Sequence, residues 1–215
     1  MTGRLRRLGW ACVTVALATG SAAAAQTATS RTIVAGHRFG PIEESTPRQR
    51  LGAIFGTRQV RDAMISIGEG MCTPGTEVLP GTPDALDLAW QDAARSRVAF
   101  VRTRSARARW TTSQGVHVGS TLSELERLAG RVLTFSGFGW DYGGGLNWSE
   151  DGGDLGLRLD IDPRDNEKAS AGQGATAIFG DRLVRSDHPL VRQLRIVVGE
   201  ITHSWGPQFQ EVDCG

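Results

Sequence analysis

The segment from Gly115 to Trp148 constrains the fold most, because it joins a capped helix to a glycine-rich aromatic corner. Thr121 precedes Glu124 by three residues, which is the spacing of a capping box. In that motif the Thr hydroxyl accepts from a helix N–H, and the Glu carboxylate accepts from the Thr N–H. Leucines then recur at helical spacing, and Gly130 marks the end. A helix of about two turns is unstable alone, so we expect it to pack on a sheet.

A weaker copy of this pattern lies at residues 40–56. Thr46 aligns with Thr121 of the later segment and is again a candidate N-cap. Pro47 would occupy the first helical position, where its missing N–H costs nothing, and Gln49 would complete the capping box. The shared order of cap, apolar face and closing glycine favours an internal duplication. The alternative is two unrelated short helices.

Alternation of apolar and polar residues predicts strands. The clearest case is residues 155–161, where leucines and Ile161 alternate with glycine, arginine and aspartate. Residues 71–83 hold three prolines and two glycines, which predicts mostly turn. Further strands are expected at residues 33–39, 59–67, 86–90, 98–103, 107–112, 131–140, 145–148 and 190–203.

These elements predict an α+β fold of two related halves, residues 26–112 and 113–215. Each half would be a short capped helix packed on an antiparallel meander sheet. The layout resembles the tandem helix-plus-meander repeats of SmpA/OmlA-like lipoproteins and of beta-lactamase-inhibitor proteins. The resemblance is carried by residues 45–56 and 119–130. It implies a repeat that binds proteins and performs no chemistry. Two family features are absent: the Gly-x-Pro after each helix and the lipidated cysteine.

Residues 1–25 have the features of a secretory signal peptide: a basic start, a short apolar stretch and alanines before a cleavage site near Ala25 and Gln26. Cleavage would remove three of the 24 basic residues and none of the 23 acidic ones. The slightly acidic remainder argues against a nucleic-acid partner. After the signal peptide, no apolar stretch is long enough to span a membrane. From the signal peptide we expect an exported protein, periplasmic or secreted, and we expect it to be a monomer.

Only Cys72 and Cys214 remain after the expected cleavage. In an oxidising compartment an isolated pair favours a disulfide over a metal site. It would close a loop of roughly 140 residues, worth about 5 kcal/mol in the chain-entropy description.

The corner at residues 137–145 is the candidate binding site. Trp140, Asp141, Tyr142 and Trp148 lie on or beside it, and aromatic side chains contribute strongly to interfaces. The ligand would be an unknown protein or an envelope component. The alternative is an aromatic plug over the end of the sheet, with Asp141 capping the turn. We expect no catalytic residue, no metal and no cofactor.

Two other function classes stay open. The chain would be a small hydrolase if Asp141 met His117 or His203 in a groove between the halves, or an inhibitor of another enzyme by analogy of fold. The arginine-rich run at residues 95–109 would either bind a phosphate or carboxylate or protect a sheet edge from pairing.

Overall fold

A single curved antiparallel sheet dominates the computed structural model, which describes residues 30–171 and 175–215. The expected signal peptide and its cleavage site lie outside the described residues. Within the described residues the sheet has eight strands in the order β10-β11-β13-β7-β6-β5-β14, with β4 also paired to β5. Their bounds are β4 (Val60–Gly68), β5 (Met71–Val78), β6 (Leu86–Trp90), β7 (Val98–Thr103), β10 (Gly145–Glu150), β11 (Gly153–Ile161), β13 (Ile196–Ser204) and β14 (Val212–Asp213).

Smaller elements flank this sheet. The strands β1 (Thr32–Val34), β2 (Arg38–Phe39), β3 (Ile42–Glu43) and β8 (Thr111–Thr112) form a second sheet, in which β1 and β8 run parallel. A two-stranded ribbon joins β9 (Thr134–Ser136) to β12 (Leu183–Arg185). The α-helices are α2 (Arg48–Phe55), α3 (Leu122–Ala129) and α4 (Asn166–Ser170), and 3-10 turns cover Thr57–Gln59, Pro163–Asp165, Ala175–Ala177 and Val191–Gln193. Among the described residues, no helix has the length and hydrophobicity that a membrane crossing requires.

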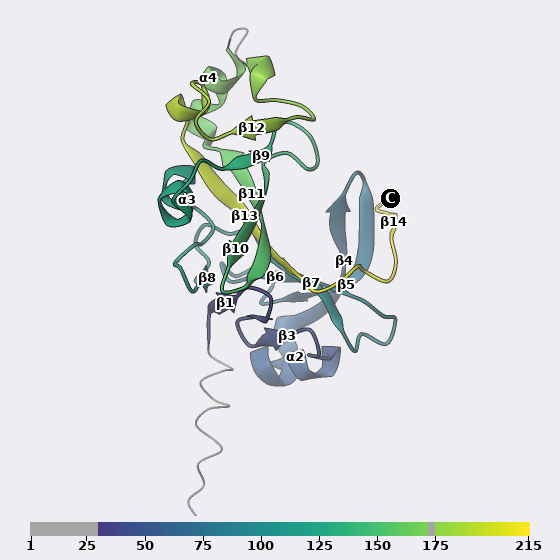
Figure 1. Cartoon of the computed structure of the whole chain (residues 1–215). Helices are drawn as coiled ribbons and strands as arrows, with labels where there is room; N and C mark the ends of the chain where they lie inside the picture. Colours follow the sequence, from purple (N-terminus) through teal and green to yellow (C-terminus); the bar gives the residue numbers. More distant parts are fainter. Residues whose placement is uncertain (1–29, 172–174) are drawn as a thin grey trace, which may run out of the picture.

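The sheet bends so that β10, β11 and β13 face the β4–β5 hairpin across an open side, with β6 and β7 at the base (Figure 1). Helices α2 and α3 cover the outer, convex side. Leu51 of α2 and Leu125 of α3 share the main buried cluster with Leu88, Val101 and Ile201 of the sheet. The concave side is therefore left without a helical cover, and its side chains are available to form a site.

Helix α3 confirms the capping-box prediction. The Glu124 N–H donates to Thr121 Oγ1 at 3.2 Å, and the Thr121 N–H donates to Glu124 Oε2 at 2.6 Å. Gly130 ends the helix in the left-handed region at φ 63°, where a residue without Cβ avoids strain.

Helix α2 does not repeat this arrangement, so the predicted first capping box is wrong. Pro47, not Thr46, is the N-cap, and no side chain caps the helix. The Thr46 hydroxyl instead accepts from the Glu43 N–H at 3.0 Å. The Arg48 N–H, at the start of the helix, donates to the Arg95 carbonyl at 3.0 Å. The main chain of another segment thus satisfies a helix end that the sequence assigned to a local cap.

A mixed α+β fold with mostly antiparallel strands is confirmed, but an arrangement of two repeated halves is not. Strand β13, from the later half, lies between β11 and β7 and pairs with both. Its partner β7 belongs to the earlier half. One sheet therefore crosses the expected boundary near residue 112, where two separate meanders were expected.

Strand β5 corrects the turn predicted at residues 71–83. At Pro74 the strand has a partner only on the β4 side, because β14 pairs with residues 71–72 and β6 with residues 75–78. The side of Pro74 away from β4 is therefore not required to supply a ladder N–H. At Gly75 a Cβ would lie 2.3 Å from the Leu88 carbonyl oxygen, so glycine permits close strand contact. The strand expected at residues 131–140 is limited to β9.

The predicted disulfide between Cys72 and Cys214 is present, with 5.1 Å between the Cα atoms and a separation of 142 residues. Strand β14 pairs with the start of β5 beside it, and the Cys214 N–H donates to the Gly70 carbonyl. The bond supports the expectation of an oxidising environment. It also fixes the C-terminal segment along one wall of the concave side.

Candidate functional site

The floor of the concave side is built by strand register. Arg102 of β7 pairs with Thr202 of β13 and with Asp87 of β6, while Arg158 of β11 pairs with Glu200. Because residues paired across an antiparallel ladder point to the same face, these five polar side chains share one surface at the middle of the sheet.

Ion pairs order this floor. Arg104 Nη1 lies 2.8 Å from Asp87 Oδ2, and its Nε lies 2.7 Å from Glu200 Oε2. Arg102 Nη2 reaches Asp87 Oδ2 at 3.2 Å and also donates to the Ser66 carbonyl at 2.7 Å. Thr202 Oγ1 donates to Glu200 Oε1 at 3.1 Å. Two guanidinium groups thus balance two carboxylates, and Arg102 ties the β4–β5 hairpin to the sheet.

Hydrogen-bonding capacity remains unused on this floor. The Nε atoms of Arg102 and Arg158 are buried and lack a hydrogen-bond partner among the described residues. Their nearest carboxylate oxygens, of Glu200 and Asp160, lie at ion-pair distances of 3.8 Å and 3.6 Å. Burial lowers the pKa of Arg102, and the charge of Glu200 offsets part of that effect; a guanidinium nevertheless stays charged in a protein. The donors that a ligand can reach belong to Arg104 and Arg158, whose side chains are 45% and 41% exposed. A ligand that brings acceptor atoms therefore meets donors at these two residues.

The corner at residues 137–145 closes over one end of this floor, and its glycines allow tight packing. Gly144 has φ 75°, and a Cβ there would lie 2.0 Å from the Leu159 carbonyl oxygen of β11. A Cβ on Gly137 would lie 2.5 Å from the Gly180 carbonyl oxygen. The Leu159 N–H donates to the Gly144 carbonyl at 2.8 Å. These close contacts make the corner a fixed support.

This support presents two aromatic rings. Trp140 and Tyr142 are 37% and 52% exposed and pack edge to face, with ring centroids 5.4 Å apart. Trp140 Nε1 donates to the Gly137 carbonyl at 2.8 Å, which orients the indole. Trp148 does not join them. It lies in β10, is 4% exposed, and donates from Nε1 to Glu150 Oε2 at 2.9 Å, because its position faces the core.

Asp141 connects the corner to the opposite wall. Its Oδ2 accepts from the Glu69 N–H at 2.6 Å, across 72 residues of sequence. Glu69 forms the tip of the β4–β5 hairpin with φ 54°, and a Cβ on the neighbouring Gly68 would lie 3.9 Å from Asp141 Cβ. The aspartate thus bridges the two ends of the curved sheet. It does not cap its own turn, which was the alternative considered from sequence.

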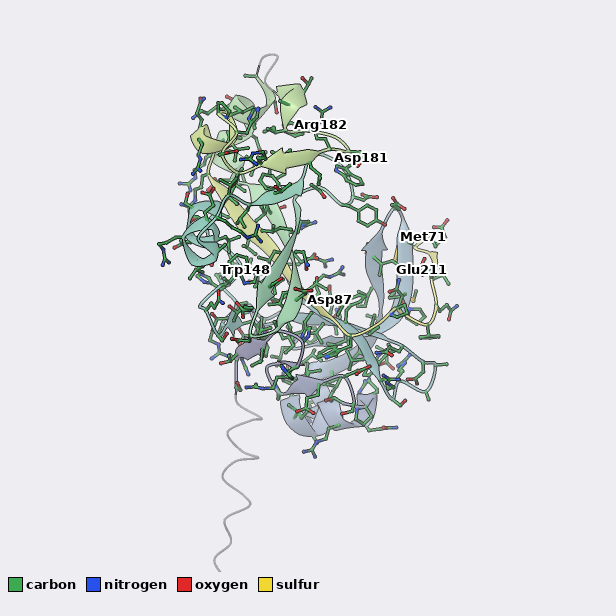
Figure 2. The ribbon with its side chains drawn as sticks, in the orientation of Figure 1. Met71, Asp87, Trp148, Asp181, Arg182 and Glu211 are labelled. Atoms are coloured by element: carbon green, nitrogen blue, oxygen red, sulfur yellow. A yellow bond between two sulfur atoms is a disulfide. The ribbon has the colours of Figure 1, made fainter. Side chains whose placement is uncertain are left out.

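Three adjoining hollows follow the concave side, and we call them together the concave groove. The largest, about 1010 Å³, contains Trp140, Arg158 and the ring of Phe179 in its lining. A hollow of about 250 Å³ shares Asp141 and Arg158 with it. A third, of about 370 Å³, shares Tyr142, Glu200 and Thr202 with the second. Figure 2 shows Asp87 at the base, with Met71 and Glu211 on the wall that the β4–β5 hairpin and the C-terminal segment form.

The groove does not bring Asp141 together with either histidine proposed for a hydrolase. The described residues that line the two hollows at Asp141 include no histidine. His203 is fully buried and stacks on Trp205, with ring centroids 4.1 Å apart. His117 is exposed and lies beside Ser120. Among the described residues, no group of three or more His, Cys, Asp or Glu side chains is placed to hold a metal ion.

The corner is evident in the sequence, but the floor is not. Strand alternation correctly placed Arg158 on the polar face of β11, yet gave it no role. Glu200 and Arg102 were also available as charged residues in the middle of long apolar strands. Their convergence depends on the β13–β7 pairing, which joins segments about 100 residues apart and has no local sequence signal.

Comparisons with protein-family models, curated proteins and solved structures found no significant match to this chain. Function therefore has to follow from the chemistry of the groove itself.

Proposed function

We propose that this chain is an exported binding protein that holds a glycan strand of the cell envelope along the concave groove. The observation that carries the proposal is the groove itself, where the partly exposed guanidinium groups of Arg104 and Arg158 lie beside the exposed rings of Trp140 and Tyr142. Sugar rings present C–H faces to aromatic side chains and hydroxyl groups to donors and acceptors at their edges.

The shape of the groove favours a glycan over an extended peptide. Peptides that add to a sheet pair with the free backbone of an edge strand. Here the floor is the face of the central strands β7, β11 and β13, whose backbones already pair within the sheet. A ligand in the groove therefore meets side chains. Their guanidinium, carboxylate and hydroxyl groups can donate to and accept from the many hydroxyl groups of a glycan.

Charge supports an uncharged or weakly charged ligand. Asp87 and Glu200 neutralise Arg102 and Arg104 on the floor. Such a balanced floor gives little long-range attraction to strongly charged chains.

Calorimetric titration with soluble hexasaccharides of glucose and of N-acetylglucosamine tests this function, with Trp fluorescence as a second readout. We expect saturable binding to at least one of them. W140A and Y142A should each weaken that binding about tenfold, or about 1.4 kcal/mol. R158Q should weaken it as well by removing a floor donor.

Met64→Ala is the matched control, because Met64 is 53% exposed on β4 and lies outside the groove lining. It should leave the affinity unchanged. Absence of saturable binding to both hexasaccharides would overturn the glycan proposal. Binding unaffected by W140A, Y142A and R158Q would place the ligand elsewhere. Binding of an unstructured peptide of similar length, lost in Y142A, would assign the groove to a protein partner instead.

A further inference from the structure

Away from the concave groove, three arginines surround one buried carboxylate. Arg31 precedes β1, Arg107 and Arg109 lie between β7 and β8, and Asp84 lies between β5 and β6. We call these four residues the arginine cradle. Together with Leu79, Thr82 and Pro83 they line a hollow of about 360 Å³.

The carboxylate holds two of the guanidinium groups in place. Asp84 Oδ2 accepts from Arg109 Nε at 2.9 Å and from Arg31 Nε at 3.4 Å, and its Oδ1 accepts from the Arg109 N–H at 2.8 Å. Arg109 Nη2 also contacts Oδ2. Burial opposes ionisation of Asp84, but the hydrogen bonds and charge of Arg109 outweigh burial and hold the Asp84 pKa below its ordinary value. The carboxylate is therefore charged and keeps the cradle ordered.

A buried tryptophan supports the cradle from below. The Arg31 guanidinium carbon lies 4.5 Å from the ring centroid of Trp110, a cation–π distance. Trp110 is 1% exposed, and its Nε1 donates to the Asp84 carbonyl at 2.9 Å. Arg31 and Asp84 thus rest on a rigid base, and less side-chain entropy is lost when a ligand binds.

The cradle has a surplus of positive charge. Three arginines face one carboxylate, and the described lining contains no other acid. Arg107 is exposed, and its side chain has no hydrogen bond or ion pair with a described residue. The Nη atoms of Arg31 and Nη1 of Arg109 are likewise without a described partner. The four earlier arginines of the run differ, because each pairs with an acidic side chain; they are Arg95, Arg97, Arg102 and Arg104.

We propose that the arginine cradle binds a phosphate or sulfate group. Arg31, Arg107 and Arg109 line one hollow, and guanidinium groups match the oxygens of such anions in geometry and charge. Of the two interpretations of the arginine run, anion binding suits this end. Protection of a sheet edge does not suit Arg102, because β7 is paired on both sides. A phosphate group occurs both in inorganic phosphate and in the headgroup of an anionic phospholipid.

Nitrogen-15 NMR of the arginine Nε–H signals tests the site. Potassium phosphate is titrated into the full chain at pH 7, with potassium chloride at matched ionic strength as the reference. We expect saturable shifts at Arg31, Arg107 and Arg109 that fit one dissociation constant. R107Q should raise that constant at least fivefold, whereas R61Q should not change it. Arg61 is also exposed, and it pairs with Glu77 at 2.6 Å. R61Q therefore removes the same charge as R107Q, but at a residue that does not line the hollow.

R107Q should fold normally because Arg107 has no described side-chain partner, and its melting temperature checks this. Shifts that grow linearly, or equally with chloride, would overturn the site, as would equal weakening by R107Q and R61Q. Co-sedimentation with phosphatidylglycerol vesicles distinguishes the sources, with phosphatidylcholine vesicles as reference. If the chain binds the phosphatidylglycerol vesicles, and both added phosphate and R107Q abolish that binding, the ligand is a lipid headgroup. Phosphate binding without vesicle binding assigns the free anion.

Discussion

His203 should make the stability of this protein fall between pH 6.5 and pH 4. Its side chain is fully buried, and neither ring nitrogen has a hydrogen-bond partner among the described residues. Burial, with a smaller contribution from the charge of His37, lowers the pKa of His203 to about 4, and the backbone of Arg38 opposes part of this shift. The ordinary value is 6.5, so the imidazole charges more readily in the unfolded chain.

The sign follows from proton binding. Between these two pKa values the unfolded chain binds more protons at His203 than the folded chain does, so acidification favours unfolding. A difference between 6.5 and about 4 corresponds to about 3 kcal/mol. This contribution is complete above pH 6.5 and is lost as the pH falls toward 4. Carboxyl groups with lowered pKa values, such as Asp84 and Glu124, lose their contribution at lower pH, below about 4.5.

Urea unfolding at half-unit steps from pH 4.5 to 7.5, with the disulfide intact, measures this dependence. H203L replaces the imidazole by an apolar group of similar size and should flatten the curve across that range. H117Q removes an exposed histidine and should leave the curve as in the parent chain. An equally steep loss of stability in H203L would refute the assignment to His203.

Two further predictions concern stability. T121A should lower the free energy of unfolding by about 1 kcal/mol, because it removes the α3 cap. T46A should not weaken α2, because the Thr46 hydroxyl accepts from the Glu43 N–H and does not cap the helix. Thermal unfolding with helix content as the readout compares the two variants, and an equal loss of helix stability would contradict this difference. Replacing Cys72 and Cys214 by serine should lower the free energy of unfolding by up to about 5 kcal/mol, measured by urea unfolding; an unchanged midpoint would show that β14 pairing alone holds the C-terminal segment.

Local structure was predictable where short-range chemistry determines it. The Thr121–Glu124 box, the alternating strand β11 and the glycine corner each depend on residues within about ten positions, and the structure has all three. Cys72 and Cys214 could be paired because the expected cleavage leaves no other cysteine.

Prediction failed where a distant segment decides the structure. The N-terminus of α2 is satisfied by the Arg95 carbonyl, so a residue nearly 50 positions away replaces the Thr46 cap. Pro74 is tolerated in β5 because β6 and β14 leave one side of it unpaired. The groove floor likewise depends on β13 lying between β7 and β11. None of these relations leaves a pattern in its own stretch of sequence.

The position of β13 has a consequence for folding. This strand lies inside the large sheet, between β11 and β7, yet covers residues 196–204. Strands β4 to β7 therefore form only an unfinished ribbon with one open edge until β13, about 100 residues beyond its partner β7, pairs with it. Such long-range pairing should make the complete sheet form late and in one cooperative step.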